Sequence, residues 1–167
     1  MGRFVNPDNS AFQVALNSKI YMDKTGLLEY TNSVLDTPEA YICNSRPRRF
    51  GKSYTANMLA AYYSKGCDSE KMFDGLTIGK SSDFKKHLNK YDVIHIDVQW
   101  FLSSCADIKS IISYITQSVF EELKEYYPEV LPNEVLTLAD ALSRIRDCIR
   151  GNVLYLCGTW KKIYCDY

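Results

Sequence analysis

Apolar positions recur along the chain in two rhythms, which together predict alternating strands and helices. Short, nearly continuous apolar runs at 40–43, 92–98 and 153–157 are typical of strands buried in a parallel sheet. Apolar residues spaced three and four apart instead predict amphipathic helices. We expect these helices at 25–34, 52–64, from about 103 to 128, and at 138–149. The order strand, helix, strand, helices, strand favours an α/β fold with a parallel sheet covered by helices.

Three weaker patterns complete the expected fold. Phe12, Val14 and Leu16 alternate with other residues, which predicts a short strand near the N-terminus. An apolar patch at 72–78 predicts a loop that packs on the core, and a short helix is expected from 82 to about 90. No linker, repeat or low-complexity tract interrupts the chain, so we expect residues 1–167 to form a single domain.

The stretch 45–55, between the first expected strand and the helix at 52–64, has the layout of a phosphate-binding P-loop. Gly51 lets the backbone approach a phosphate, and the N–H groups at the start of the helix point toward an anion. Lys52 would reach the β- and γ-phosphates of a nucleotide, and the Ser53 hydroxyl would hold Mg²⁺. The predicted nucleotide-binding residues are Arg48, Arg49, Phe50, Gly51, Lys52, Ser53 and Tyr54.

One position departs from the usual P-loop spacing, because Arg46 stands where the first glycine is expected. Pro47 fixes its own φ angle and stiffens the loop, which partly replaces what a glycine-rich loop achieves. A basic surface turn before a helix is the alternative interpretation of the same residues.

Overall charge limits the partners of the chain. It has 20 basic and 20 acidic residues and a formal net charge of zero, so no global field attracts nucleic acid or a membrane. The local cluster from Arg46 to Lys52 leaves open a non-catalytic nucleic-acid-binding module that uses this loop. The chain opens with no secretory signal and has no apolar run long enough to span a membrane, so we expect a cytoplasmic protein. The oligomeric state does not follow from the sequence.

Two separated motifs carry a family resemblance. Residues 21–25 read Tyr-Met-Asp-Lys-Thr and residues 46–53 read Arg-Pro-Arg-Arg-Phe-Gly-Lys-Ser, with Phe-Asp-Gly-Leu following at 73–76. Over about residues 3–150 the chain resembles the bacterial AAA-ATPase-like family, in which the missing first glycine is usual. The resemblance implies a P-loop NTPase-like three-layer fold that binds ATP with Mg²⁺. For Asp23 and Lys24, whose role in the family motif we do not derive, a helix cap and a surface ion pair are the plain interpretations.

Near its end the chain departs from the family pattern. Relatives have an apolar strand that ends in the two Walker B acids, whereas the expected strand at 153–157 is followed here by Gly158 and Thr159. Most relatives then continue into a restriction-endonuclease-like domain, but this sequence stops ten residues past Cys157. We therefore expect a truncated N-terminal part of such a protein, with a sheet incomplete at its C-terminus. A non-functional product is a further alternative.

ATP hydrolysis needs catalytic groups, including a carboxylate, that ATP binding does not need. A carboxylate must help to hold the Mg²⁺ ion and another group must orient the attacking water. Asp97, which ends the run Val93-Ile94-His95-Ile96, is by pattern a candidate Walker B aspartate, and a cap at the end of a buried strand is its alternative role. His95 is expected to be a core or strand-end residue, with a catalytic role as the alternative. The sequence thus predicts ATP binding and leaves hydrolysis unassigned.

Overall fold

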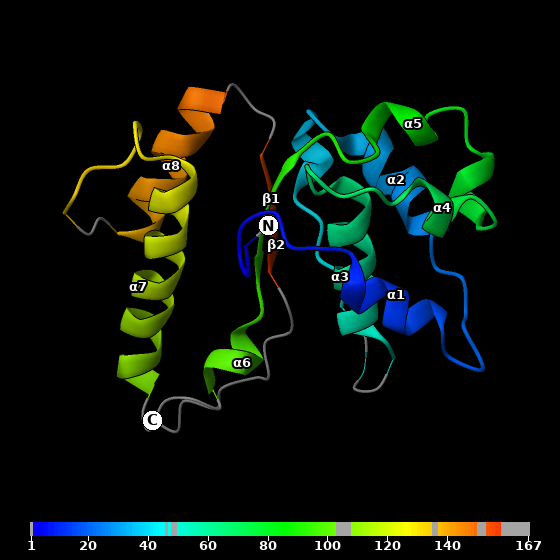
Figure 1. The fold of residues 1–167 in the computed structure, drawn as a ribbon, viewed down its shortest axis with the longest axis horizontal. Coiled ribbons are helices and arrows are strands. Elements are labelled where there is room, and N and C mark those ends of the chain that lie inside the picture. Colours follow the sequence, from blue (N-terminus) through cyan, green and yellow to red (C-terminus); the bar gives the residue numbers. More distant parts are fainter. Residues whose placement is uncertain are drawn as a thin grey trace.

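Helices cover both faces of a small parallel sheet in the computed structural model (Figure 1). The structure describes residues 2–45, 47, 50–102, 108–134, 137–149 and 153–157. Within them the chain is a mixed helix and strand protein, as the sequence predicts for an α/β fold.

The sheet consists of β1 (Asp92–Ile96) and β2 (Val153–Cys157), which pair in parallel from Asp92↔Val153 to Ile96↔Cys157. These two strands confirm two of the three strand predictions, although β1 ends two residues earlier than expected because α6 (Val98–Leu102) begins there. The N-terminal segment lies along the other edge of β1. The Asn6 N–H donates to the Val93 carbonyl at 2.7 Å, and the His95 N–H donates to the Phe4 carbonyl at 2.7 Å.

The strand predicted at 40–43 is wrong. Its first residue ends the 3₁₀ helix η1 (Pro38–Ala40), and residues 41–45 have no regular secondary structure. The Tyr41 side chain is 94% exposed, so the apolar run is not buried. Strands form only where a neighbour accepts and donates the ladder hydrogen bonds. No described residue supplies such a ladder to this segment.

The strand predicted around residues 12–16 is also wrong, because helix α1 (Ser10–Leu16) forms there. Phe12 and Ala15 are buried, whereas Val14 is 69% exposed. Positions three apart therefore share the buried face, which is the helical period. The chain segment is too short for its alternation to distinguish the two periods.

One face of the sheet is covered by the helices from the first half of the chain: α1, α2 (Gly26–Val34), α3 (Lys52–Tyr63), α4 (Glu70–Phe73) and α5 (Phe84–His87) (Figure 1). The predicted helices at 25–34 and 52–64 are confirmed, and the helix expected at 82–90 is shorter. The 72–78 patch packs on the core as predicted, through Phe73 and through Ile78 of η2 (Thr77–Lys80). Met58, Tyr62 and Tyr63 of α3 are buried in the same cluster.

The other face is covered by α6, α7 (Ile108–Tyr126) and α8 (Leu138–Ile149). The helices α7 and α8 correspond to those predicted from about 103 to 128 and at 138–149, whereas α6 was not predicted. Residues 103–107, which the sequence assigns to the start of the long helix, lie outside the described residues. The predicted start of α8 is confirmed, because the Asp140 N–H donates to Thr137 Oγ1 at 3.2 Å. Val93 of β1 packs with the α3 cluster and Ile94 with the α7–α8 cluster, so successive strand residues serve opposite faces.

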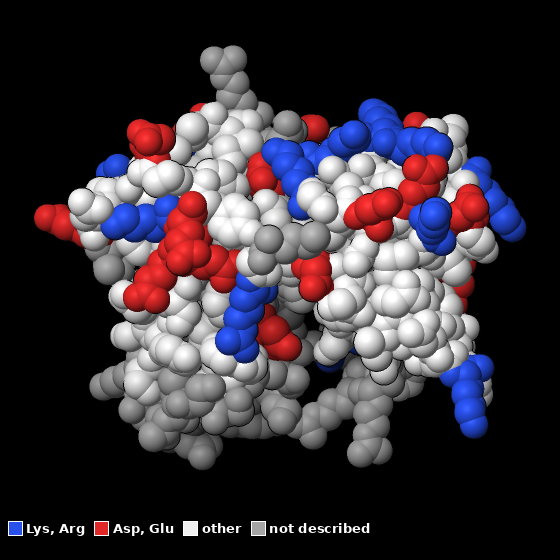
Figure 2. Space-filling model, viewed as in Figure 1, with Lys and Arg blue, Asp and Glu red and all other residues white. Residues whose placement is uncertain are grey.

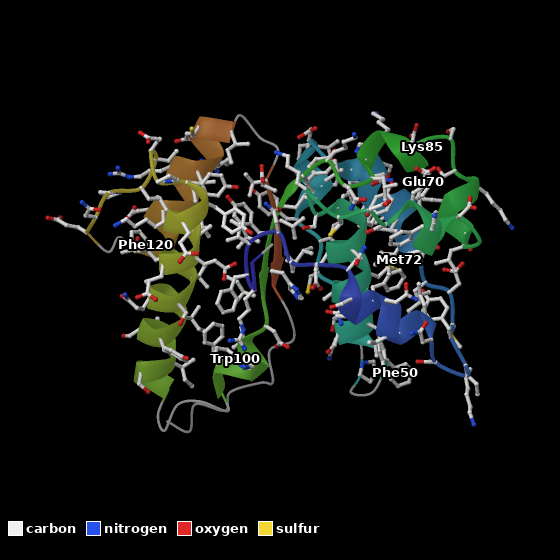
Figure 3. The ribbon with its side chains drawn as sticks, viewed as in Figure 1. Phe50, Glu70, Met72, Lys85, Trp100 and Phe120 are labelled. Atoms are coloured by element: carbon white, nitrogen blue, oxygen red, sulfur yellow. The ribbon has the colours of Figure 1, made fainter. Side chains whose placement is uncertain are left out.

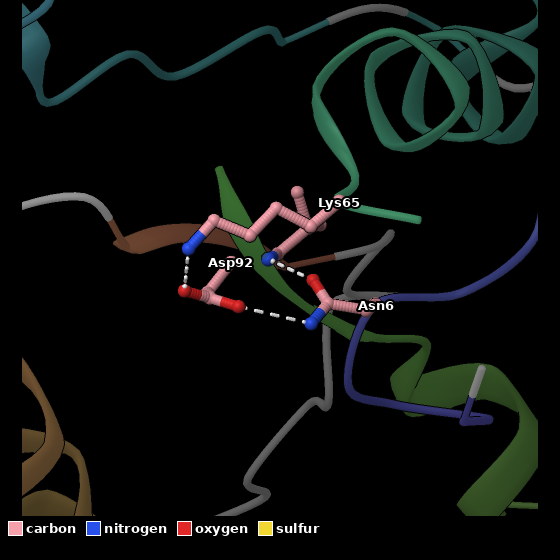
Figure 4. A network of polar contacts seen from close by, with 4 residues as sticks. Asn6, Lys65 and Asp92 are labelled. Atoms are coloured by element: carbon pink, nitrogen blue, oxygen red, sulfur yellow. Dashed lines mark hydrogen bonds and ion pairs between the residues drawn. The ribbon is translucent and has the colours of Figure 1, made fainter. Parts of the chain in front are cut away.

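A polar network fixes how α3 lies on the sheet (Figure 4). Asp92 accepts from Asn6 Nδ2 at 3.0 Å and from Lys65 Nζ at 2.5 Å, and the Val93 N–H donates to Asn6 Oδ1 at 2.8 Å. Ser64 also forms a parallel bridge with Tyr91. The C-terminal end of α3 is thereby held at the start of β1. The N-terminal end of α3 consequently lies toward the carboxyl ends of the strands.

Candidate functional site

The predicted phosphate-binding loop leads directly into α3. Gly51 precedes the helix with φ of +74°, in the left-handed region that favours glycine, and Lys52 is the first helical residue. Thr55 closes the first turn, because its N–H and its Oγ1 both donate to the Gly51 carbonyl, at 3.0 and 3.1 Å. The first N–H groups of a helix have no acceptor within the helix, and the first turn of α3 has no acidic residue. This end of α3 can therefore receive an anion.

The side chains of the loop face outward. Phe50 and Tyr54 are 58% and 55% exposed, Ser53 is exposed and Lys52 is partly exposed. Figure 3 shows Phe50 at the end of α3 that lies far from Lys85 and α5. Lys52 and Ser53 are thus accessible to a ligand from solvent, whereas Phe50, Gly51 and Tyr54 could contribute their backbone N–H groups. Arg48 and Arg49, and also Arg46, lie outside the described residues.

Lys24, from the motif at 21–25, contacts this loop. Its Nζ donates to the Phe50 carbonyl at 2.9 Å. A Cβ added to Gly51 would lie 2.5 Å from the same Nζ, so a side chain at position 51 would displace the ammonium group. The contact gives Lys24 a backbone acceptor in the loop, which neither plain interpretation of the sequence anticipates.

Asp23 and Thr25, on either side of Lys24, bind a different part of the chain. Asp23 Oδ2 accepts from the N–H and the hydroxyl of Thr77, at 2.8 and 2.7 Å, and its Oδ1 accepts from the N–H and hydroxyl of Thr25. Thr25 Oγ1 in turn accepts from the Ile78 N–H at 3.1 Å. Burial raises the pKa of Asp23, but the hydrogen bonds from Thr77 and Thr25 outweigh it and lower the pKa to about 2. Asp23 therefore ties the start of α2 to η2, which is more than a helix cap.

Asp97, the candidate catalytic residue, is half-buried between β1 and α6. It follows the carboxyl end of β1, where ligands bind in many parallel α/β sheets. The N-terminal end of α3 lies toward the same end of the sheet, as Phe50 and Trp100 in Figure 3 indicate. Burial lowers the pKa of the neighbouring His95 and the charge of Asp97 partly opposes this, which favours a neutral imidazole. The catalytic role of Asp97 stays a prediction.

Charge on the described surface is mixed. On the face in Figure 2, basic and acidic side chains are interspersed across the upper half and the middle of the view. Surface hollows of about 150 and 260 Å³ are lined by residues of α8 with Tyr155 and by residues between Asp68 and Lys90. Neither hollow includes residues 50–55. Among the described residues, no helix combines the length and the apolar character that crossing a bilayer requires.

Sequence reasoning missed Thr77 and did not assign Lys24. The only available signal was the resemblance of residues 21–25 to a family motif, since a Lys-to-carbonyl contact leaves no periodic pattern. Thr77 is 54 residues from Asp23, and nothing in the sequence indicates that pairing.

Comparison with known proteins identifies a family for most of the chain. A family model, AAA-ATPase-like and described as "Predicted AAA-ATPase", matches residues 10–157. The matched span includes the motif at 21–25, the loop at 45–55 and both strands. No curated protein and no solved structure matches the chain.

Proposed function

The chain belongs to the predicted AAA-ATPase family, and from this premise we propose that its loop at 48–54 binds the triphosphate of ATP together with Mg²⁺. The observation that carries the proposal is the start of α3: a left-handed Gly51, then Lys52 as the first helical residue, with no acid in the first turn. A helix end of this kind favours negative charge through its N–H groups and its dipole. The family match favours a nucleotide as the source of that charge.

The residues at the helix start fit a magnesium nucleotide. Lys52 and Ser53 are accessible, and Gly51 leaves no side chain over the backbone. Lys52 would neutralise phosphate charge, Ser53 would offer its hydroxyl to the metal, and the N–H groups from Arg49 to Tyr54 would form the cradle. Bound Mg²⁺ would supply positive charge that offsets the negative charge of the phosphates.

We extend the proposal to a P-loop NTPase-like three-layer fold formed by residues 1–167 as one domain, in a cytoplasmic protein. The helices on both faces of the parallel sheet support this fold. The proposal includes binding and stops before hydrolysis. Asp97 is the one carboxylate that we nominate for catalysis, because it follows β1 at the carboxyl edge of the sheet.

Titration with a fluorescent ATP analogue tests the proposal. We expect Lys52→Ala to weaken binding at least about tenfold, because a charge-assisted contact to phosphate is lost. Ser53→Ala should abolish most of the gain in affinity that Mg²⁺ provides. Lys19→Ala removes an exposed lysine outside the loop and is the matched control. Binding that ignores Mg²⁺ and survives Lys52→Ala unchanged rules out the proposal.

A nucleic-acid-binding module remains the second candidate from the sequence, but no contact in the described residues favours it. The zero net charge and the mixed surface in Figure 2 make a poor electrostatic footprint for a nucleic acid. An oligonucleotide shift that weakens steeply with salt, without ATP binding, would favour it over nucleotide binding.

A further inference from the structure

We propose that Lys24 is a positioning residue for the phosphate-binding loop: its ammonium group holds the Phe50 carbonyl and thereby orients the Gly51 N–H. The inference rests on the proposed ATP site and assigns a role in it to the motif at 21–25. Lys24 lies 26 residues before the carbonyl that it contacts, in a segment that no P-loop pattern includes.

The backbone of Lys24 is held firmly from both sides. Asp23 and Thr25 take part in five hydrogen bonds that tie this segment together and to residues 77 and 78. The Lys24 carbonyl accepts from the Leu27 N–H at 3.0 Å, which joins it to the start of α2. Thr25 is fully buried. Lys24 is therefore a long side chain on a fixed base, and its ammonium group reaches the loop from that base.

Contact with the Phe50 carbonyl controls the next amide. A trans peptide group is planar, and its C=O and N–H point in opposite directions. With its oxygen bound to Lys24 Nζ at 2.9 Å, the peptide between Phe50 and Gly51 directs the Gly51 N–H away from Lys24. Rotation of this peptide would break a charge-assisted hydrogen bond. Lys24 thus selects one orientation for an N–H of the proposed cradle.

The identity of residue 51 follows from the same contact. Its φ of +74° strains any residue with a side chain, and an added Cβ would lie 2.5 Å from Lys24 Nζ. Glycine is needed both for the backbone conformation and for the approach of the ammonium group. Loop and motif consequently constrain one another although they are separated in the sequence.

The contact also predicts which ligands depend on it. Lys24 and Lys52 place two positive charges near the start of α3, which the helix dipole disfavours. A ligand with several negative charges relieves this repulsion more than a ligand with few. Loss of the Lys24 ammonium group should therefore weaken the binding of ATP and of inorganic tripolyphosphate more than the binding of AMP.

The test compares Lys24→Met, Lys24→Arg and the exposed control Lys19→Met. We expect Lys24→Met to weaken Mg²⁺–ATP and tripolyphosphate binding about tenfold, with AMP affected about threefold or less. Lys24→Arg keeps a charged donor and should retain most of the affinity. The thermal midpoint of each ligand-free variant should stay within about 3 °C of the wild type, because the side chain contributes little to the core.

A second readout needs no nucleotide. In protein labelled with ¹⁵N at its eight glycines, the amide signal of Gly51 should shift in Lys24→Met and stay in place in Lys19→Met. Wild-type protein that binds no ATP overturns the proposed function. Wild-type protein that binds ATP, with Lys24→Met binding equally well or an unmoved Gly51 signal, overturns only the role of Lys24.

Discussion

The two faces of the sheet are built from different kinds of side chains. On the α3 face, Tyr62 and Tyr63 are fully buried and their hydroxyl groups have partners inside the cluster. On the α7–α8 face most of the buried side chains are aliphatic, such as Leu123 and Ile145, and the buried ring of Phe101 stacks on Phe4 with 5.4 Å between ring centroids. The loop that we assign to ATP belongs to the first face.

Hydrogen bonds crosslink the α3 face. The Tyr63 hydroxyl donates to Asn32 Oδ1 at 2.7 Å and lies 2.6 Å from Thr31 Oγ1, which joins α3 to α2. The Tyr62 hydroxyl donates to the Phe84 carbonyl at 2.8 Å, which joins α3 to α5. Burial raises the pKa of Tyr62 to about 12, so the phenol stays protonated and can donate.

The α7–α8 face has the opposite property at Tyr127. Its hydroxyl is buried without a hydrogen-bond partner among the described residues. Burial and the Asp92 carboxylate, which acts on this phenol through its charge and its close approach, raise the pKa of Tyr127.

Apolar packing holds most of the α7–α8 face together, and Glu122 Oε1 of α7 accepts hydrogen bonds from the Phe4 and Val5 N–H groups at 2.9 and 2.7 Å. On the α3 face, hydrogen bonds from the buried tyrosines fix α3 against α2 and α5, while the Ser53 and Tyr54 side chains in its first turn remain exposed.

The largest expected effect on stability comes from truncating a large buried side chain in either hydrophobic cluster. Phe73→Ala removes a ring whose centroid lies 5.0 Å from that of Phe12 and 5.4 Å from that of Tyr62. This substitution should lower the free energy of unfolding by about 3–5 kcal/mol. Ile145→Ala, in the cluster on the α7–α8 face, should lower the free energy of unfolding by about 2–5 kcal/mol. Urea unfolding measures both.

Because β1 serves both clusters, each of these two variants should shift one cooperative transition. Two separate unfolding transitions, of which each variant shifts only the one that belongs to its own cluster, would show that the two faces unfold independently.

A matched pair of tyrosine substitutions gives a medium effect. Tyr63→Phe leaves polar atoms of Thr31 and Asn32 without their partner and should cost about 1–2 kcal/mol. Tyr127→Phe removes a hydroxyl with no described partner and should change stability by less than about 0.5 kcal/mol. Equal costs in urea unfolding would contradict the contrast between the two faces.

The smallest expected effect is a pH dependence at Asp23. Its folded pKa of about 2 lies below the ordinary value of 3.8. Its carboxylate therefore stabilises the fold above about pH 4, and this contribution is lost as the pH falls from about 4 to 2. The difference in thermal midpoint between wild type and Asp23→Asn should be constant near neutral pH and shrink across that window.

Thr77→Val offers an independent check of the cause. It removes one hydroxyl donor to Asp23, so the folded pKa of Asp23 should rise toward its ordinary value. The acid-induced loss of stability should then be smaller than in the wild type and complete at a higher pH. An unchanged pH profile in both variants would contradict the tether between Asp23 and η2.

Long amphipathic patterns were predictable from the sequence because local spacing alone decides them. The helices α2, α7 and α8 follow apolar stripes at helical spacing, and the start of α8 is set by Thr137 and Asp140 within one turn. The apolar runs of β1 and β2 were predictable for a related reason, since buried parallel strands are apolar on both faces. The start of α3 just after Gly51 also follows from local signals.

Segments whose state depends on distant partners were not predictable. The run at 40–43 has strand composition, yet no described strand lies against it, and its residues are exposed. Residues 10–16 formed a helix because burial of Phe12 and Ala15 outweighed a short alternation. The roles of Asp23 and Lys24 depend on residues 77 and 50, which lie far from them in the sequence.

By itself, the sequence indicated the α/β character, the long helices, the two strands and the position of the candidate loop, because the pattern that reveals each of them lies within a few consecutive residues. Only the tertiary structure decided which segment contacts that loop. Lys24 reaches the Phe50 carbonyl because Asp23 and Thr25 hold its backbone against η2. Such an arrangement requires three separated segments to pack together, and packing of that kind leaves no periodic trace along a chain.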